Sequence, residues 1–166
     1  MSAPSWVADS IFYQIFPDRF ANGDTSNDPV NVQRWGARPT LRGFQGGDLR
    51  GIIQGLSYLE ELGINAIYLN PIFFATTNHR YNTSDYFRID PRLGTKDDFR
   101  ELIREAHARD IRVVLDGVFN HTGRGFFAFQ DILENENQSA YADWYHVYGF
   151  PLDAYGDGKA TRYEAW

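Results

Sequence analysis

The sequence predicts an α/β fold built on a parallel sheet. Strand-like and helix-like segments alternate along the first 123 of 166 residues, and polar residues gather where the strand-like segments end. The composition, 43% hydrophobic and 23% charged, is typical of a folded globular domain. Because strands and helices alternate, we expect parallel strands joined by right-handed crossovers.

The first part of this pattern is a strand, a helix and a second strand. The runs "IFYQIF" (residues 11–16) and "INAIYLN" (residues 64–70) are rich in β-forming residues, and each is followed by a proline. Between them a helix is predicted, with Asp48 as its N-cap and Gly63 at its end. Its apolar positions recur at helical spacing and are Leu49, Ile52, Ile53, Leu56, Leu59 and Leu62.

A second helix and a third strand repeat the pattern. Thr95 is a candidate N-cap, and the run "IRVVLDGVF" (residues 111–119) follows the helix as a strand. The apolar face of this helix consists of Phe99, Leu102, Ile103 and Ala106. Beyond Thr122 the periodicity fades, and only one short helix is predicted, around residues 127–135.

Two connections are longer than a simple turn requires. Residues 17–47 follow the first strand and residues 71–94 follow the second, whereas strand-to-helix loops usually have roughly 2–6 residues. Both loops leave the carboxyl ends of their strands, as does the polar cluster in "DGVFNH" (residues 116–121). Parallel α/β folds place their active sites at this edge, so we expect the functional site there.

Composition narrows the classes of ligand and the location. The net charge of −6 argues against nucleic acid and against an anionic membrane surface, since both require clustered lysine and arginine. The chain has no cysteine and no recognisable signal peptide, which predicts a cytoplasmic location. Aromatic residues make up 16% of the chain, and many lie in loops. For any one of them a core position is the commoner role, but aromatic rings displayed from loops also suit the apolar faces of sugars.

The string "DGVFNH" resembles the first conserved region of the α-amylase superfamily (glycoside hydrolase family 13), a D-x-x-x-N-H pattern that ends the third barrel strand. Residues 78–95, "NHRYNTSDYFRIDPRLGT", and residues 11–24, "IFYQIFPDRFANGD", are similar to other segments of the family, as are "GGDLRGI" and "SAYADWYHV". The resemblance extends over about residues 6–166 and is greatest to the neopullulanase, cyclomaltodextrinase and maltogenic amylase branch.

This resemblance implies a more specific fold. Residues 1–123 would form the N-terminal portion of a TIM (β/α)8 barrel, comprising strands one to three with their helices. Residues 124–166 would begin the irregular domain that the family inserts after strand three. A complete barrel typically takes ~250 residues.

The resemblance also assigns roles to individual residues. His121 matches a histidine that donates a hydrogen bond to glucose, and Tyr81 matches a tyrosine that stacks on the same ring. Asp116 matches a buried aspartate that orients its neighbours, and Asn120 a residue that supports the loop or ligates calcium. His79 is expected to line the cleft. Without the family pattern, each of these side chains would more often be structural.

A calcium site is implied in the first long loop. The stretch "ANGDTSND" carries four oxygen-bearing side chains, and Ca²⁺ takes 6–8 oxygen ligands at about 2.3–2.6 Å. The implied ligands are Asn22, Asp24, Asn27, Asp28, the carbonyl of Gly46, and Asp48. Without the resemblance, a set of metal-free Asx turns would be favoured. Asp48 has two candidate roles, helix cap and ligand, which the sequence does not separate.

The sequence departs from the family in its catalytic groups. Retaining glycosidases need two carboxyl groups about 5–5.5 Å apart. In this family they come from strands four and five, with a third aspartate after strand seven, and no matching pattern occurs in these 166 residues. Asn82 also stands where many relatives carry aspartate.

Three functions therefore stay open. The first is a fragment of an α-glucan hydrolase that cleaves α-1,4 or α-1,6 bonds with retention and is inactive alone, because its nucleophile and general acid are absent. The second is a non-catalytic module that binds α-glucan or maltooligosaccharide. The third is a partial barrel that assembles as a homo-oligomer or with a complementing chain.

Overall fold

A three-stranded parallel sheet forms the centre of the computed structural model, which describes residues 3–156 and 162–165. The strand order is β1 (Phe12–Ile15), β2 (Ala66–Leu69) and β5 (Arg112–Leu115). Phe12 pairs with Ala66, which pairs with Arg112, so the strands run in register and end at the same edge. The predicted parallel sheet is confirmed.

The third strand is shorter than predicted. It ends at Leu115, whereas the sequence suggested a strand through Phe119. Val118 has a φ of 48°, and a β-branched residue in this region cannot continue a strand. Residues 116–121 therefore form a loop, and the polar cluster lies beyond the strand end.

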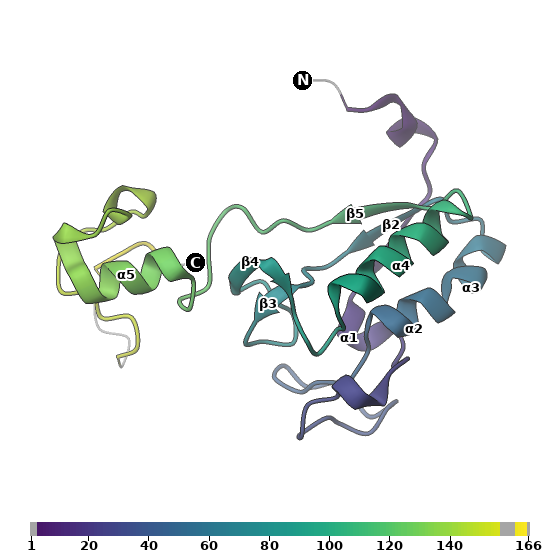
Figure 1. The fold of residues 1–166 in the computed structure, drawn as a ribbon, viewed down its shortest axis with the longest axis horizontal. Helices are drawn as coiled ribbons and strands as arrows, with labels where there is room; N and C mark the ends of the chain where they lie inside the picture. The colour runs from purple at the N-terminus through teal and green to yellow at the C-terminus, as the bar shows by residue number, and fades with distance from the viewer. Residues whose placement is uncertain (1–2, 157–161, 166) are drawn as a thin grey trace.

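Three helices cover one face of the sheet: α2 (Leu49–Gln54), α3 (Leu56–Glu61) and α4 (Lys96–His107) (Figure 1). The prediction of one helix before β2 is wrong, because α2 and α3 are separate helices that meet at Gly55. A Cβ on Gly55 would lie 2.6 Å from the ring of Phe20, so the close approach of this ring requires glycine. Leu62, one of the apolar positions of the predicted helix, lies beyond the end of α3 and is 53% exposed.

The predicted helix caps are confirmed. Asp48 accepts a hydrogen bond from the N–H of Gly51 at 2.6 Å. Thr95 and Asp98 form a reciprocal capping box at the start of α4. Gly63, at a φ of 81°, follows α3 as the predicted terminator.

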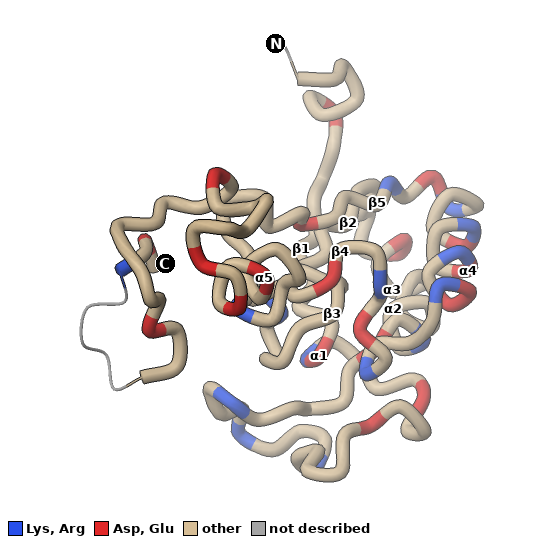
Figure 2. Tube along the Cα trace, turned by 60° about the vertical axis from the view of Figure 1, so that its left-hand side comes forward, with Lys and Arg blue, Asp and Glu red and all other residues tan. Residues whose placement is uncertain are grey.

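The apolar core lies between the sheet and these helices. Its fully buried side chains are Ile15, Leu49, Ile52, Leu56, Leu59, Ile67, Leu69, Ile72, Leu93, Leu102 and Ile111. Charges of both signs lie along the outer face of α4 (Figure 2), where Arg100 contacts Asp97 at 2.5 Å and Arg109 contacts Glu105 at 3.1 Å. Exposed ion pairs contribute about 0–1 kcal/mol each, so the buried apolar face holds the helix in place.

The long loops contain structure that the sequence did not indicate. A four-residue helix, α1 (Pro17–Phe20), and a 3-10 helix, η2 (Thr25–Asn27), lie in the first loop. The second loop forms an antiparallel hairpin of β3 (Phe73–Ala75) and β4 (Thr83–Ile89). Another 3-10 helix, η1 (Ser5–Asp9), precedes β1.

An extended segment leads from β5 to a second group of elements (Figure 1). The short helix predicted there is confirmed as α5 (Phe127–Asn135), and two 3-10 helices follow, η3 (Glu136–Gln138) and η4 (Ala142–Trp144). Phe129, Ala154 and Tyr163 form a small second core. In the described part of the chain, no helix is long and apolar enough to span a membrane.

Candidate functional site

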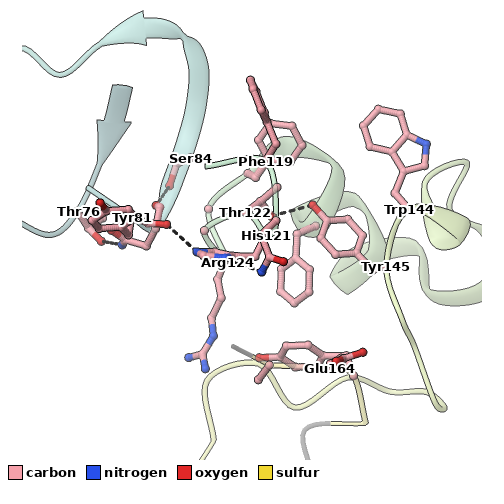
Figure 3. A pocket seen from close by; sticks show the side chains of 18 of the residues that line it. Thr76, Tyr81, Ser84, Phe119, His121, Thr122, Arg124, Trp144, Tyr145 and Glu164 are labelled. Atoms are coloured by element: carbon pink, nitrogen blue, oxygen red, sulfur yellow. Dashed lines mark hydrogen bonds between the residues drawn. The ribbon is translucent and has the colours of Figure 1, made fainter. Parts of the chain in front are cut away.

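A cleft of about 1050 Å³ opens between the turn of the β3–β4 hairpin, the loop after β5 and the C-terminal segment (Figure 3). Tyr81 lies on one side of the cleft and Trp144 and Tyr145 on the other, with His121 and Thr122 between them. His79 and Asn120 also line the cleft. The second long loop and the polar cluster after the third strand therefore meet as expected, whereas no residue of the first long loop, residues 17–47, lines this cleft.

Asp116 interacts with two tyrosines on the Tyr81 side of the cleft. Its carboxylate accepts hydrogen bonds from the hydroxyls of Tyr81 and Tyr68, and its Oδ1 accepts from the N–H of Val118 at 3.1 Å. Burial, the hydrogen bond to Asp116 and the charge of that carboxylate raise the pKa of Tyr81 to about 12. The same causes, burial first, raise the pKa of Tyr68. Tyr81 therefore stays neutral near pH 7.

His121 is joined to Tyr81 by a second contact. Its Nε2 lies 2.9 Å from the carbonyl oxygen of Tyr81, and because a carbonyl only accepts, Nε2 carries the proton and donates it. The Nδ1 is then an acceptor, and the side-chain amide of Asn120 donates to it at 3.3 Å. Donation from Nε2 to a sugar oxygen would have to share or replace the bond to Tyr81.

His79 lies beside the ring of Tyr81. The two ring centroids are 5.9 Å apart with an interplanar angle of 30°, and the N–H of Tyr81 donates to Nδ1 of His79 at 3.1 Å. Burial and the nearby charge of Arg80 lower the pKa of His79, so its imidazole is neutral at pH 7. A sugar that stacks on Tyr81 would take the ring face opposite His79.

The structure brings together all five residues expected at the sugar site, namely His79, Tyr81, Asp116, Asn120 and His121. It also shows two tyrosines that the sequence reading missed. Tyr68 on β2 reaches Asp116, and the hydroxyl of Tyr86 on β4 lies 2.8 Å from the carbonyl of Val118 and 3.0 Å from that of His121. The sequence could have indicated them, because the hydroxyl of a tyrosine in or near the end of a buried strand needs a polar partner.

The six candidate calcium ligands lie apart from the cleft, in and next to the loop after β1. Asp48 lies at the end of this loop, as the N-cap of α2, and both roles predicted for it involve its carboxylate. Besides capping α2, it accepts hydrogen bonds from the N–H groups of Gly23 at 3.1 Å and Asp24 at 2.8 Å. The side-chain amide of Asn27 donates to it at 3.2 Å. The capping role is confirmed, and the ligand role stays a prediction.

Two buried amide oxygens in this loop have no hydrogen-bond partner: Oδ1 of Asn22 and Oδ1 of Asn27. The amide nitrogen of Asn22 donates to both carboxylate oxygens of Asp28, at 2.9 and 3.1 Å. Gly46 has a φ of 84°, and a Cβ there would lie 2.3 Å from Oδ1 of Asp28, so only glycine allows this approach. The unpartnered oxygens fit a hard cation such as calcium.

Asp24 is the N-cap of η2. Its carboxylate accepts from the N–H of Ser26 at 2.9 Å, and hydrogen bonds from Ser26 lower the pKa of Asp24. Within residues 3–156 and 162–165, no group of three or more His, Cys, Asp or Glu side chains is arranged to hold a metal. A calcium site here would depend on amide and carbonyl oxygens as much as on carboxylates.

Comparison with known proteins identifies the family. The model for the alpha amylase catalytic domain matches residues 14–160. The chain belongs to the alpha-amylase family. A cyclomaltodextrinase from Bacillus sp is 56% identical over 159 residues, which are 95% of this chain and 28% of the relative. Neopullulanase 2 from Thermoactinomyces vulgaris is 50% identical over 167 residues, covering 99% of this chain and 28% of the relative.

A solved structure confirms the fold. The cyclic alpha-maltosyl-(1→6)-maltose hydrolase from Arthrobacter globiformis, in complex with its cyclic sugar, superposes with a TM-score of 0.92 and 54% identity. All of this chain is covered, against 37% of that protein. The chain thus corresponds to part of an alpha-amylase family barrel, as predicted, and spans about 28% of the length of its curated relatives.

Proposed function

We propose that this chain provides one wall of the substrate cleft of an α-glucan-acting glycoside hydrolase. The observation that carries the proposal is the cluster of Tyr81, Asp116 and His121, in which Tyr81 interacts with Asp116 and His121 is bonded to the carbonyl of Tyr81. Tyr81 offers an apolar ring for stacking, and Nε2 of His121 beside it would donate to a sugar hydroxyl by sharing or replacing its bond to the carbonyl of Tyr81. A sugar needs both, because its C–H faces are apolar and its hydroxyls are polar.

The substrate class we propose is maltooligosaccharides and related α-glucans with α-1,4 or α-1,6 linkages. The relatives named above are a cyclomaltodextrinase, a neopullulanase and a hydrolase of a cyclic maltosyl-maltose. Hydrolysis with retention requires a nucleophile and a general acid, and this sequence carries neither family pattern. We therefore expect weak sugar binding, without turnover, from these 166 residues alone.

We propose calcium as the structural cofactor of the loop after β1. Asn22, Asn27 and Asp28 would hold it with side-chain oxygens, together with the carbonyl of Gly46. The ion would supply positive charge to the unpartnered oxygens and hold the loop against the start of α2.

A cytoplasmic location is also proposed, supported by 50% identity over 151 residues to an intracellular maltogenic amylase of Bacillus subtilis.

Calorimetric titration with maltotriose or acarbose tests the sugar site. Tyr81→Ala removes the stacking ring, and a stacking contact is worth about 0.5–1.5 kcal/mol, so affinity should fall by roughly 2- to 12-fold. Tyr81→Phe is the matched control, since it keeps the ring and removes only the hydroxyl that contacts Asp116. Equal affinity of wild type and Tyr81→Ala would contradict the assignment.

We further propose that the outer edge of β5 pairs with a second copy of the chain. Among the described strands β5 pairs only with β2, and an apolar hollow of about 270 Å³ lies beside it. Phe73, Phe87, Phe99 and Leu115 line this hollow. Unpaired strand edges and apolar hollows favour association. A monomer in sedimentation velocity at micromolar concentration would contradict self-association and favour a complementing chain as the partner.

A further inference from the structure

Arg80 stands between the two cleft residues His79 and Tyr81 but faces the opposite way. Its side chain is 1% exposed and is among the largest fully buried side chains of the described residues. Its backbone has a φ of 60°, a left-handed conformation that residues other than glycine, asparagine and aspartate rarely adopt. Such a conformation persists only when surrounding contacts enforce it.

The contacts of the Arg80 guanidinium hold the backbone in this left-handed conformation. Its Nε donates to Oδ2 of Asp90 at 2.9 Å, and its Nη1 donates to the carbonyl of Asn78 at 2.6 Å. Asp90 is fully buried, and its own N–H donates to the carbonyl of Ile72 at 2.9 Å, just before β3. Arg80 therefore ties the tip of the hairpin to its base through a buried ion pair.

Neighbouring residues fix the same turn from other directions. The side-chain amide of Asn78 donates to the carbonyl of Gly43 at 2.7 Å in the loop after β1. The hydroxyl of Thr83 donates to the carbonyl of Arg80 at 3.2 Å. These bonds hold the turn, but only Arg80 combines a buried charge with the reversed backbone.

The reversed backbone at Arg80 determines how His79 and Tyr81 are oriented toward the cleft. Because the chain turns there, the imidazole of His79 accepts from the N–H of Tyr81, and the carbonyl of Tyr81 faces Nε2 of His121 at 2.9 Å. Relaxing Arg80 to an ordinary φ would move the Tyr81 peptide and both rings. The orientation of the sugar-contacting groups thus depends on a side chain that is buried away from solvent.

We propose that Arg80 is a positioning residue for sugar binding, holding the turn that presents His79 and Tyr81 to the cleft through its buried ion pair with Asp90. This inference rests on the proposed function of the cleft. Arg80 acts through its neighbours, and it is assigned no contact with the sugar.

The test compares Arg80→Gln and Arg80→Lys with Arg92→Gln. Arg92 is the matched control, because its Nη2 also donates to Oδ2 of Asp90 at 2.9 Å although it lies outside the turn. Maltotriose affinity should fall at least tenfold in Arg80→Gln. It should fall less in Arg80→Lys, which keeps the charge facing Asp90, and by under twofold in Arg92→Gln. All proteins are compared where circular dichroism shows them folded.

A second readout is independent of sugar. Nitrogen-15 NMR at pH 8 should show His121 of the wild type as the Nε2–H tautomer, because Nε2 donates to Tyr81. That signature should be lost in Arg80→Gln and kept in Arg92→Gln; His121→Asn assigns the signal. If wild type binds no sugar, the proposed function fails, but the tautomer still tests Arg80.

Two results would overturn the inference. One is a folded Arg80→Gln or Arg80→Lys with wild-type affinity and an unchanged His121 tautomer. The other is an equal loss of affinity in Arg92→Gln, which would show that any weakening around Asp90 has the same effect. If Arg80→Gln does not fold, Arg80→Lys alone tests the proposal. Wild-type maltotriose affinity together with an unchanged His121 tautomer in Arg80→Lys would then refute it.

Discussion

The loop after β1 and the turn between β3 and β4 are each organised by a buried charged side chain, and the two charges have opposite sign. Asp48 accepts four hydrogen bonds in the loop, three of them from backbone N–H groups. Arg80 donates in the turn and is paired with Asp90. The turn thus contains both partners of its charge pair, although Nη2 of Arg80 is buried without a hydrogen-bond partner, whereas the loop leaves the oxygens of Asn22 and Asn27 without donors. This difference indicates that the turn neutralises its own charge and that the loop has room for a cation.

The largest expected effect concerns the buried charge pair of the turn. Asp90→Asn removes the carboxylate that neutralises both Arg80 and Arg92, and breaking a buried pair costs about 3–5 kcal/mol. Urea denaturation should show this loss in the free energy of unfolding. Asp97→Asn is the control, because its ion pair with Arg100 is exposed and should change stability by under about 1 kcal/mol. Similar effects of both substitutions would contradict the importance of the buried pair.

Calcium addition tests whether the unpartnered oxygens of Asn22 and Asn27 bind a cation. A ligand that binds only the native state adds about 2.7 kcal/mol at a hundredfold excess over its Kd. We expect the melting temperature to rise with calcium and fall again with chelator in the wild type. The rise should be much smaller in Asn22→Ala, which removes one unpartnered oxygen. A melting curve of the wild type that calcium and chelator leave unchanged would count against the site.

The smallest expected effect concerns Tyr81 at alkaline pH. Its pKa in the folded chain, about 12, lies above the ordinary value of 10.0, so the stability it contributes is present below pH 10 and is lost as pH rises toward 12. Asp116→Asn removes a neighbouring negative charge and should lower this pKa. Absorbance at the tyrosinate band measures the titration, and Tyr81→Phe identifies which tyrosine is responsible. An unchanged titration in Asp116→Asn would exclude the aspartate as a cause of the raised pKa.

Local sequence signals predicted much of this fold. The apolar runs gave β1 and β2, and Asp48 and Thr95 were recognised as helix caps, because each signal lies within a few residues of its effect. The β3–β4 hairpin was missed, because its strands have register shifts and no clean alternation of apolar and polar residues. The break at Gly55 was missed for another reason, since it depends on Phe20, which is distant in sequence.

In the candidate site, too, the sequence indicated residues in local motifs and missed those that depend on distant partners. His79, Tyr81, Asp116, Asn120 and His121 were found because they lie in short recognisable motifs. Tyr68 and Arg80 were not, because their partners Asp116 and Asp90 are brought close only by strand pairing and by the hairpin. Whether a side chain faces the cleft or the interior depends on backbone reversal, as at Arg80, and no spacing rule predicts it.

The carboxylate of Asp48 joins parts of the chain that could otherwise fluctuate independently. The same group receives the amide protons of Gly23 and Asp24 in the loop and of Gly51 in the first turn of α2. Opening the loop therefore removes donors from the group that caps the helix, and fraying of the helix frees the group that orders the loop. The amides of Gly23, Asp24 and Gly51 should behave as one cooperative unit in hydrogen exchange, with similar protection although Gly23 and Gly51 lie 28 residues apart in sequence.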